Sequence, residues 1–206
     1  MARVSQEHLD ARRRQILAGA ARCFARSGFH GTSMQDVLKE VGLSAGAVYR
    51  YFAGKGDLIA AIADDAFRII RKAFEEAVDL VPPPTPDVLL GRVMRGVLEG
   101  RIFDLERREC AALMVQVWAE TLRDDRLAQT LGEGFAGMRE AWTKLVEAYR
   151  AAGLMPPGVP ADDVARTMIA TAQGFLAQEA LFGGAEPEVL ESGLRGLMSM
   201  VPQKIS

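Results

Sequence analysis

Apolar residues recur along this chain mainly at spacings of three and four positions. That spacing places them on one face of an α-helix, whereas a half-buried strand alternates apolar and polar residues with a period of two. No segment alternates convincingly with period two. The pattern therefore predicts an all-α fold.

Capping and helix-breaking residues divide the pattern into about nine helices. Three short helices are expected before residue 55, over 10–26, 33–41 and 44–51, and a long one over 55–80. Further helices are expected near 87–102, 105–122, 125–152, 161–182 and 187–201. We expect residues 1–54 to form an N-terminal three-helix domain and residues 55–206 a C-terminal helical bundle, connected by the helix over 55–80.

Residues 33–52 predict a helix-turn-helix, with a turn at Gly42 between two short helices. Val48 and Phe52 lie four positions apart and are expected to face the core. The opposite face is then free to enter the major groove of DNA. Its small residues let the backbone approach the bases, and Tyr49 and Arg50 offer groups for a thymine methyl, a phosphate or a guanine edge.

Hydroxyl and ammonium groups beside these helices are expected to anchor the phosphate backbone, because helix N-termini also attract anions. The predicted DNA-binding residues are Thr32, Ser33, Ser44, Ala45, Gly46, Ala47, Tyr49, Arg50, Tyr51 and Lys55. Phosphate contact and a solvated helix start are equally open readings for the basic run at residues 12–14.

The segment 28–62 closely resembles the DNA-binding head of the TetR family of bacterial transcription regulators. The resemblance is carried by Gly31-Thr32, Val37, Gly42-Leu43-Ser44, Gly46, Tyr49, Tyr51-Phe52, Lys55 and Leu58. The family usually shows Tyr-Tyr-His-Phe where this chain has Tyr49-Arg50-Tyr51-Phe52, which leaves the operator sequence open. The resemblance implies a repressor that binds a palindromic operator as a homodimer and is released by a small-molecule effector.

The resemblance also implies an effector pocket inside each helical body. Candidate contacts are aromatic and methionine side chains, with one carboxylate as a polar handle: Met94, Phe103, Met114, Trp118, Glu120, Phe135, Met138 and Trp142. Such side chains suit an adaptable apolar pocket. Each of them is also compatible with ordinary core packing. Ligand binding is expected to pivot the long helix and change the spacing of the two heads.

The last two predicted helices carry apolar stripes that suit a four-helix dimer interface. The candidates are Met168, Ala172, Phe175, Leu176, Leu190, Leu194, Leu197 and Met198. Core packing within one chain is the alternative for each of them.

The net charge of -2 conceals an asymmetry. Residues 1–57 hold nine basic and five acidic residues, a net +4, and residues 58–206 hold 16 and 22, a net -6. A basic head on an acidic body suggests two different tasks, with DNA contact assigned to the head.

Other classes are disfavoured by missing motifs. Residues 132–137 spell GxGxxG, but they keep helical spacing and follow no strand, so no nucleotide cofactor is expected. No nucleophile with a base partner is evident, so an all-helical enzyme built around Glu120 or Asp104 is disfavoured. A helical adaptor that binds another protein remains the alternative. With two histidines and no Cys/His cluster, no metal site is expected.

The chain is expected to work in the cytoplasm, without a membrane partner. Its longest stretch free of charged residues, 167–178, has 12 residues, against the roughly 20 that a membrane span needs. Cys23 and Cys110 are expected to be buried apolar side chains of a reducing compartment. A redox pair is the alternative for the cysteines, and His30 is expected to be structural or solvated.

Overall fold

The computed structural model describes residues 6–99 and 103–200. Within these ranges it contains nine α-helices and no strand, which confirms the all-α prediction. The helices are α1 Gln6–Gly31, α2 Met34–Val41, α3 Ala45–Tyr49, α4 Lys55–Val78, α5 Pro86–Leu98, α6 Arg107–Glu120, α7 Asp125–Ala151, α8 Ala161–Phe182 and α9 Pro187–Met198.

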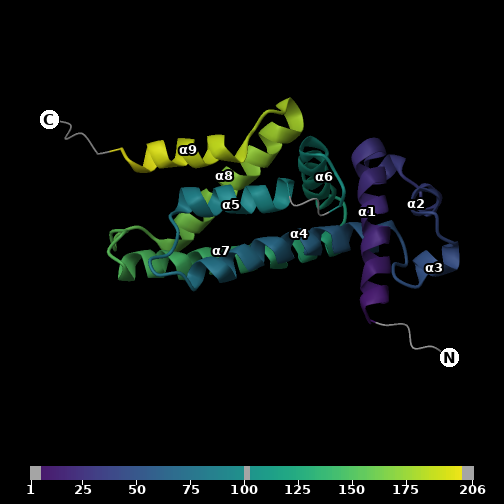
Figure 1. The fold of residues 1–206 in the computed structure, drawn as a ribbon, viewed down its shortest axis with the longest axis horizontal. Coiled ribbons are helices and arrows are strands. Elements are labelled where there is room, and N and C mark those ends of the chain that lie inside the picture. Colours follow the sequence, from purple (N-terminus) through teal and green to yellow (C-terminus); the bar gives the residue numbers. More distant parts are fainter. Residues whose placement is uncertain (1–5, 100–102, 201–206) are drawn as a thin grey trace.

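The first three helices form a small head at one end of the molecule (Figure 1). Local signals define its helix ends: Ser33 and Asp36 form a capping box at the start of α2, and Gly42 ends that helix with a left-handed φ of 65°. The Ser44 side chain accepts a hydrogen bond from the Ala47 amide and caps α3. Because these signals are local, the sequence predicts this part of the fold well.

The structure corrects the ends of α1, which was expected over 10–26. The helix already begins at Gln6 and runs to Gly31, with a break at Gly28, where φ is 75° and ψ is 164°. The expected stop at residues 27–28 is therefore a kink, and the chain makes a further helical turn beyond it.

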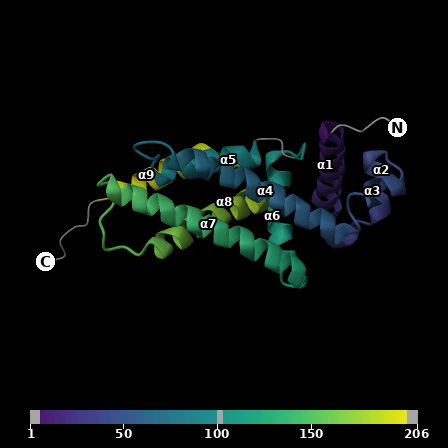
Figure 2. The ribbon, with the colours of Figure 1, turned by 90° about the horizontal axis from the view of Figure 1, so that it is seen from below.

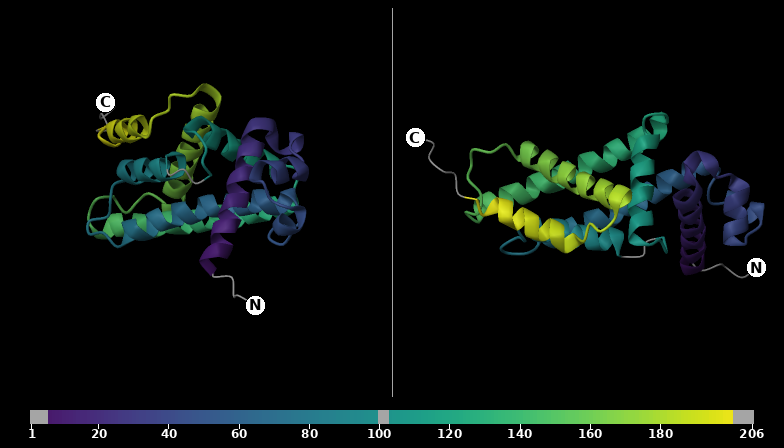
Figure 3. Two further views of the ribbon diagram at one scale, coloured as in Figure 1. Left: turned by 45° about the vertical axis from the view of Figure 1, so that its right-hand side comes forward. Right: turned by 90° about the horizontal axis from the view of Figure 1, so that it is seen from above.

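The remaining helices form an elongated body. The 24 residues of α4 span about 36 Å and run from the head along α7, as Figures 1 and 2 both show. Helix α8 packs against α6 and α7, and α9 lies along α5 on the outside of the body (Figure 3).

Several body helices are shorter than predicted. Helix α4 ends at Val78, α5 at Leu98, α7 at Ala151 and α9 at Met198. Helix α6 starts at Arg107 because Glu106 and Glu109 form a capping box, and it ends at Glu120. The expected extension to residue 102 includes residues 100–102, which lie outside the described ranges, as does residue 201.

Candidate functional site

The exposed face of α3 is the candidate DNA-reading surface. Val48 is fully buried and Phe52 nearly so, which fixes the orientation of this short helix on the head. Ala45, Gly46 and Arg50 are exposed and Tyr49 is 47% exposed, so the outward residues are those predicted from the spacing. Arg50 has no ion-pair partner among the described residues and its Cζ lies 5.6 Å from the Tyr51 ring centroid. This face combines small residues, a phenol and a guanidinium.

The structure gives three of the predicted hydroxyl anchors structural roles. Thr32 is 2% exposed, and its Oγ1 donates to the carbonyl oxygens of Cys23 (3.1 Å) and Gly28 (2.8 Å), which corrects its assignment to the phosphate backbone. The Ser33 hydroxyl donates to Asp36, and the hydrogen bonds from Ser33 lower the pKa of that carboxyl. The Ser33 and Ser44 side chains cap α2 and α3, so neither hydroxyl is free of partners.

Tyr51 and Lys55 also have surroundings that the sequence did not indicate. Tyr51 was predicted to contact DNA, but its side chain is half-buried, and its hydroxyl is buried without a hydrogen-bond partner among the described residues. The Lys55 ammonium donates to the Phe29 carbonyl oxygen (2.9 Å) and lies 4.7 Å from the centroid of the Phe29 ring. Lys55 therefore fastens the start of α4 to the end of α1.

Ion pairs decide which basic residues of α1 remain available for DNA. Arg13 pairs with the buried carboxylate of Asp65 on α4 at 3.2 Å. Arg22 and Arg26 pair with Glu40, and their hydrogen bonds lower the pKa of that carboxyl. Arg14 is exposed and has no ion-pair partner among residues 6–99 and 103–200. Within the run at residues 12–14, Arg13 is structural and Arg14 remains a candidate for phosphate contact.

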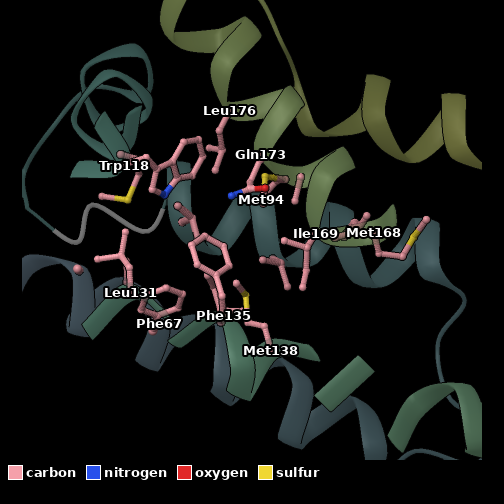
Figure 4. Close-up of a pocket in the computed structure, with 18 of the residues that line it drawn as sticks. Phe67, Met94, Trp118, Leu131, Phe135, Met138, Met168, Ile169, Gln173 and Leu176 are labelled. Atoms are coloured by element: carbon pink, nitrogen blue, oxygen red, sulfur yellow. The ribbon is translucent and has the colours of Figure 1, made fainter. Parts of the chain in front are cut away.

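An apolar cavity, partly open to solvent, lies in the body between α4, α5, α6, α7 and α8. Its volume is about 70 Å³, whereas one water needs roughly 10–15 Å³ by the same measure. The lining residues are Ala63, Ala66, Phe67, Ile70, Phe74, Leu90, Val93, Met94, Val97, Met114, Val117, Trp118, Leu131, Phe135, Met138, Trp142, Met168, Ile169, Ala172, Gln173 and Leu176. Figure 4 shows most of these side chains converging on the cavity. None of the described residues that line it is charged.

Most of the predicted effector contacts meet at this cavity. Met94, Met114, Trp118, Phe135, Met138 and Trp142 all line it. Phe103 and Glu120 do not. Phe103 is buried in the core elsewhere, and the Glu120 carboxylate lies 3.0 Å from His30 Nε2 on the head. The structure therefore places the predicted polar handle at the junction of head and body.

Helix α8 supplies cavity residues that sequence reasoning assigned to the dimer interface. Met168, Ala172 and Leu176 face the cavity, together with Gln173, which was not singled out. Helical spacing grouped Phe175 with these residues, although adjacent residues differ by about 100° around a helix. The sequence signal that could have identified α8 as part of the cavity wall is the absence of charged residues over 167–178.

Gly134 allows the wall of the cavity to close around an aromatic ring. A Cβ atom at this position would come within 2.3 Å of the Phe67 ring, which packs edge-on against Phe135 with 5.4 Å between centroids. Gly132 and Gly137 have open space at the same point. The GxGxxG letters therefore lie in the middle of α7, and only Gly134 among them is required by close packing.

A second hollow lies on the other side of α8, between α8 and α9. It is an open groove lined by Thr171, Gly174, Phe175, Gln178, Phe182, Gly183, Gly184, Ala185, Val189, Leu190, Gly193, Leu194 and Leu197. Phe182 is 78% exposed and Leu197 66% exposed. Of the predicted interface residues, Phe175, Leu190, Leu194 and Leu197 line this groove, and Met198 is exposed beside it.

Ion pairs dock α9 on α5. Arg195 pairs with the buried Asp87 at 2.9 Å, and Arg95 pairs with Glu188 and Glu191. Burial alone would raise the pKa of Asp87, but hydrogen bonds, including that from Arg195, leave it lowered. Leu194 of α9 is buried in the core, whereas Val189, Leu197 and Met198 remain exposed.

Ion pairs join the head to the body. Besides His30 and Glu120, Arg13 of α1 pairs with Asp65 of α4 at 3.2 Å. Within the body, Arg126 of α7 pairs with Asp57 at the start of α4 at 2.9 Å. Arg22 lies 3.8 Å from Asp104 in the α5–α6 connection. Trp118 lines the cavity two residues before Glu120, so one end of α6 contacts both the cavity and the head.

The cysteines are buried and free. The Cys110 thiol donates to the Val97 carbonyl oxygen (3.4 Å), and burial raises its pKa to about 11. Burial also raises the pKa of Cys23. Both thiols are therefore protonated at neutral pH, which disfavours the redox alternative.

Comparison with known proteins identifies the fold and the head together. The TetR-family model of bacterial regulatory proteins matches residues 16–62, and the C-terminal model of BetI-type transcriptional repressors matches residues 92–197. The chain belongs to the TetR family. As a member, it is a DNA-binding transcriptional regulator with a helix-turn-helix head.

Individual TetR-family relatives resemble the chain over nearly its whole length. The transcriptional repressor Rv1474c of Mycobacterium tuberculosis is 29% identical, over 94% of this chain and 95% of that protein. The repressor AcnR of Corynebacterium jeikeium is 25% identical, over 95% of this chain and 98% of that protein.

Solved structures show the same architecture. GusR of Salmonella enterica matches with a TM-score of 0.74 and 26% identity, over 97% of this chain and all of that one. FadR of Bacillus subtilis, solved with stearoyl-CoA, matches with a TM-score of 0.71 and 17% identity, over 89% of this chain and 96% of that one. At 17% identity, the second match shows the fold alone.

Two further findings concern metals and membranes. No cluster of three or more potential metal-ligating side chains occurs in the part of the chain that the structure describes. None of its described helices is both long and apolar enough to cross a bilayer.

Proposed function

We propose that this TetR-family regulator is a repressor that binds a palindromic operator as a homodimer and leaves it when a small molecule occupies the cavity. The observation that carries the proposal is the course of α4, which begins at the head and forms one wall of the cavity. A change in the cavity wall can therefore alter the position of the head. Residues 1–54 would act as the DNA-binding domain and residues 55–206 as the ligand-binding and dimerisation domain.

The groove between α8 and α9 supports the homodimer. The groove exposes large apolar side chains such as Phe182 and Leu197, and such a surface favours a protein partner. The groove of a second copy would bury these side chains in a two-fold interface. A two-fold dimer also matches a palindromic operator, because two recognition helices must reach sites one DNA turn apart. Phe175, Leu190, Leu194, Leu197 and Met198 are the proposed interface residues.

Two routes support communication between cavity and head. Along α4, Phe67 lines the cavity and Asp65 holds Arg13 of the head. Along α6, Trp118 lines the cavity and Glu120 holds His30. The head can take two positions relative to the body, and a ligand that binds the protein more tightly in one of them shifts the population toward it. The factor by which the ligand weakens DNA binding is then the factor by which DNA weakens ligand binding.

The cavity itself supports ligand binding rather than catalysis. None of its lining residues is charged, and none is a serine, threonine or cysteine nucleophile. We propose a cytoplasmic site of action, where the operator is accessible. An adaptor role is not favoured, because it would leave the exposed face of α3 without a purpose.

Arg50→Ala tests the DNA-binding part of the proposal. A gel shift with the DNA that flanks the protein's own gene should show at least about tenfold weaker binding, since a charged contact to DNA is lost. Arg123→Ala, in the turn between α6 and α7, is the matched control and should bind normally. Unchanged binding by Arg50→Ala, with an unchanged circular dichroism spectrum, would contradict the role of α3 in DNA recognition.

A further inference from the structure

The cavity has almost no polar groups of its own. Among its lining residues, the polar side-chain atoms are the amide of Gln173 and the indole N–H groups of Trp118 and Trp142. Figure 4 shows Gln173 among the apolar side chains of the wall, in the neighbourhood of Trp118 and Met94. An ionised ligand would find no charged partner among the described residues that line the cavity.

Gln173 is also without a hydrogen bond to any other described residue, although it is only partly exposed. A polar amide at an apolar cavity gains when a partner is supplied. The two indoles only donate hydrogen bonds, whereas the Gln173 amide can also accept one. Gln173 is therefore the strong hydrogen-bond acceptor of this wall.

We propose that the cavity selects uncharged, mainly apolar molecules that carry a hydroxyl group, and that the hydroxyl donates to Gln173 Oε1. This inference rests on the proposed function of the cavity as the effector site. A carboxylate or an ammonium group is rejected, because burying it here removes water without supplying a counter-ion. Gln173 is thus the residue that determines specificity.

The size of the cavity and the composition of its wall favour slender ligands. About 70 Å³ is less than half of the roughly 150 Å³ cavity that accommodates benzene in another protein. Met94, Met114, Met138 and Met168 are flexible side chains that can rearrange around an alkyl chain. A short linear alcohol therefore needs the least rearrangement.

The chain contains two tryptophans, and both line the cavity, so its intrinsic fluorescence reports on occupancy directly. Purified full-length protein is titrated with 1-hexanol, hexanoate, hexylammonium and 1-chlorohexane. We expect a saturable change with 1-hexanol at concentrations at least tenfold lower than with either ion. Equal affinity for an ion, or no saturable response to 1-hexanol, would overturn the proposal.

Gln173→Met removes the amide and keeps the length and flexibility of the side chain. It should weaken 1-hexanol binding about fivefold or more, and leave 1-chlorohexane binding unchanged or tighter, since that probe has no hydroxyl. Gln129→Met, an exposed position on α7, is the control and should bind both probes normally. An equal loss of both probes would indicate general disruption and would overturn the specific role of Gln173, as would unchanged binding of 1-hexanol.

A gel shift of the same preparations separates this inference from the proposed function. Operator binding without selective 1-hexanol binding would refute the ligand class alone. Selective 1-hexanol binding that never alters operator binding would support the ligand class and contradict release by the cavity.

Discussion

The two faces of α8 border two apolar hollows with different properties. On one face, Met168, Ala172 and Leu176 line a partly enclosed cavity, and none of the described residues around it is charged. On the other, Phe175 and Phe182 line a groove open to solvent, where Phe182 is largely exposed. Apolar composition alone does not distinguish these surfaces.

Enclosure is the property that distinguishes them. The cavity is the more enclosed of the two and can surround most of a small molecule, which suits a ligand. An open groove covers only one side of its occupant, which suits a second protein surface. The difference supports the proposal that one face of α8 binds the ligand and the other forms the dimer interface.

The largest expected effect comes from placing a charge in the groove. Leu197→Arg should prevent dimerisation, because an unpaired cation would be buried between two copies. Light scattering should show a monomer, and operator affinity should fall at least about 100-fold, because one head contacts only one half-site. Since Leu197 is exposed in the single chain, the thermal midpoint of the isolated fold should change little.

The matched control for this change is Leu122→Arg. Leu122 is 84% exposed and lies in the turn between α6 and α7, away from the groove. The Leu122→Arg variant should remain dimeric. A dimeric Leu197→Arg variant with normal operator binding would show that the groove is not the dimer interface.

A smaller effect is expected from narrowing the cavity. Gly134→Ala forces the Phe67 ring to move, and because that ring is part of the wall, 1-hexanol binding should weaken about tenfold. Overpacking should cost about 1–3 kcal/mol, partly offset by roughly 1 kcal/mol from helix propensity. The dimer should persist in light scattering.

Gly132→Ala controls for the change in helix propensity, because its Cβ meets open space on the same helix. It should keep ligand affinity and gain slightly in thermal stability. If Gly134→Ala disrupted the dimer while ligand binding survived, the division of tasks between the two faces of α8 would be reversed.

The smallest effect is expected at the junction of head and body. His30→Ala removes the contact with Glu120, and since the histidine is mostly exposed, folding should be nearly unaffected. The ratio of 1-hexanol affinities with and without operator DNA should shrink about two- to fivefold. Calorimetric titrations measure this ratio. An unchanged ratio would leave α4 as the route of communication.

The head was predicted well because the interactions that define its helix ends join residues close together in the sequence. Ser33, Gly42 and Ser44 act within three or four residues of themselves, so their capping roles follow from the sequence. Thr32 and the Tyr51 hydroxyl were predicted to contact DNA but are buried, because their burial depends on how α1, α2 and α3 pack together. Helical spacing gives the face of a helix but not the neighbour that covers it.

Glu120 and Met168 show the same limit in the body. A carboxylate two residues from a tryptophan looked like a polar handle, but the turn of α6 directs it to His30, 90 positions earlier in the chain. The stripe on α8 was recognised as apolar, but its division between cavity and groove depends on where α6, α7 and α9 lie. Gln173 carried no sequence signal of its own.

The sequence by itself determined the all-α fold, the helix-turn-helix, the outward residues of α3 and the division between a basic head and an acidic body. These properties depend on local spacing, capping and composition. Tertiary structure alone decided which apolar residues enclose a cavity, which remain exposed in a groove, and which polar pairs join head to body. Those properties depend on contacts between helices far apart in the chain, and a one-dimensional pattern does not specify them.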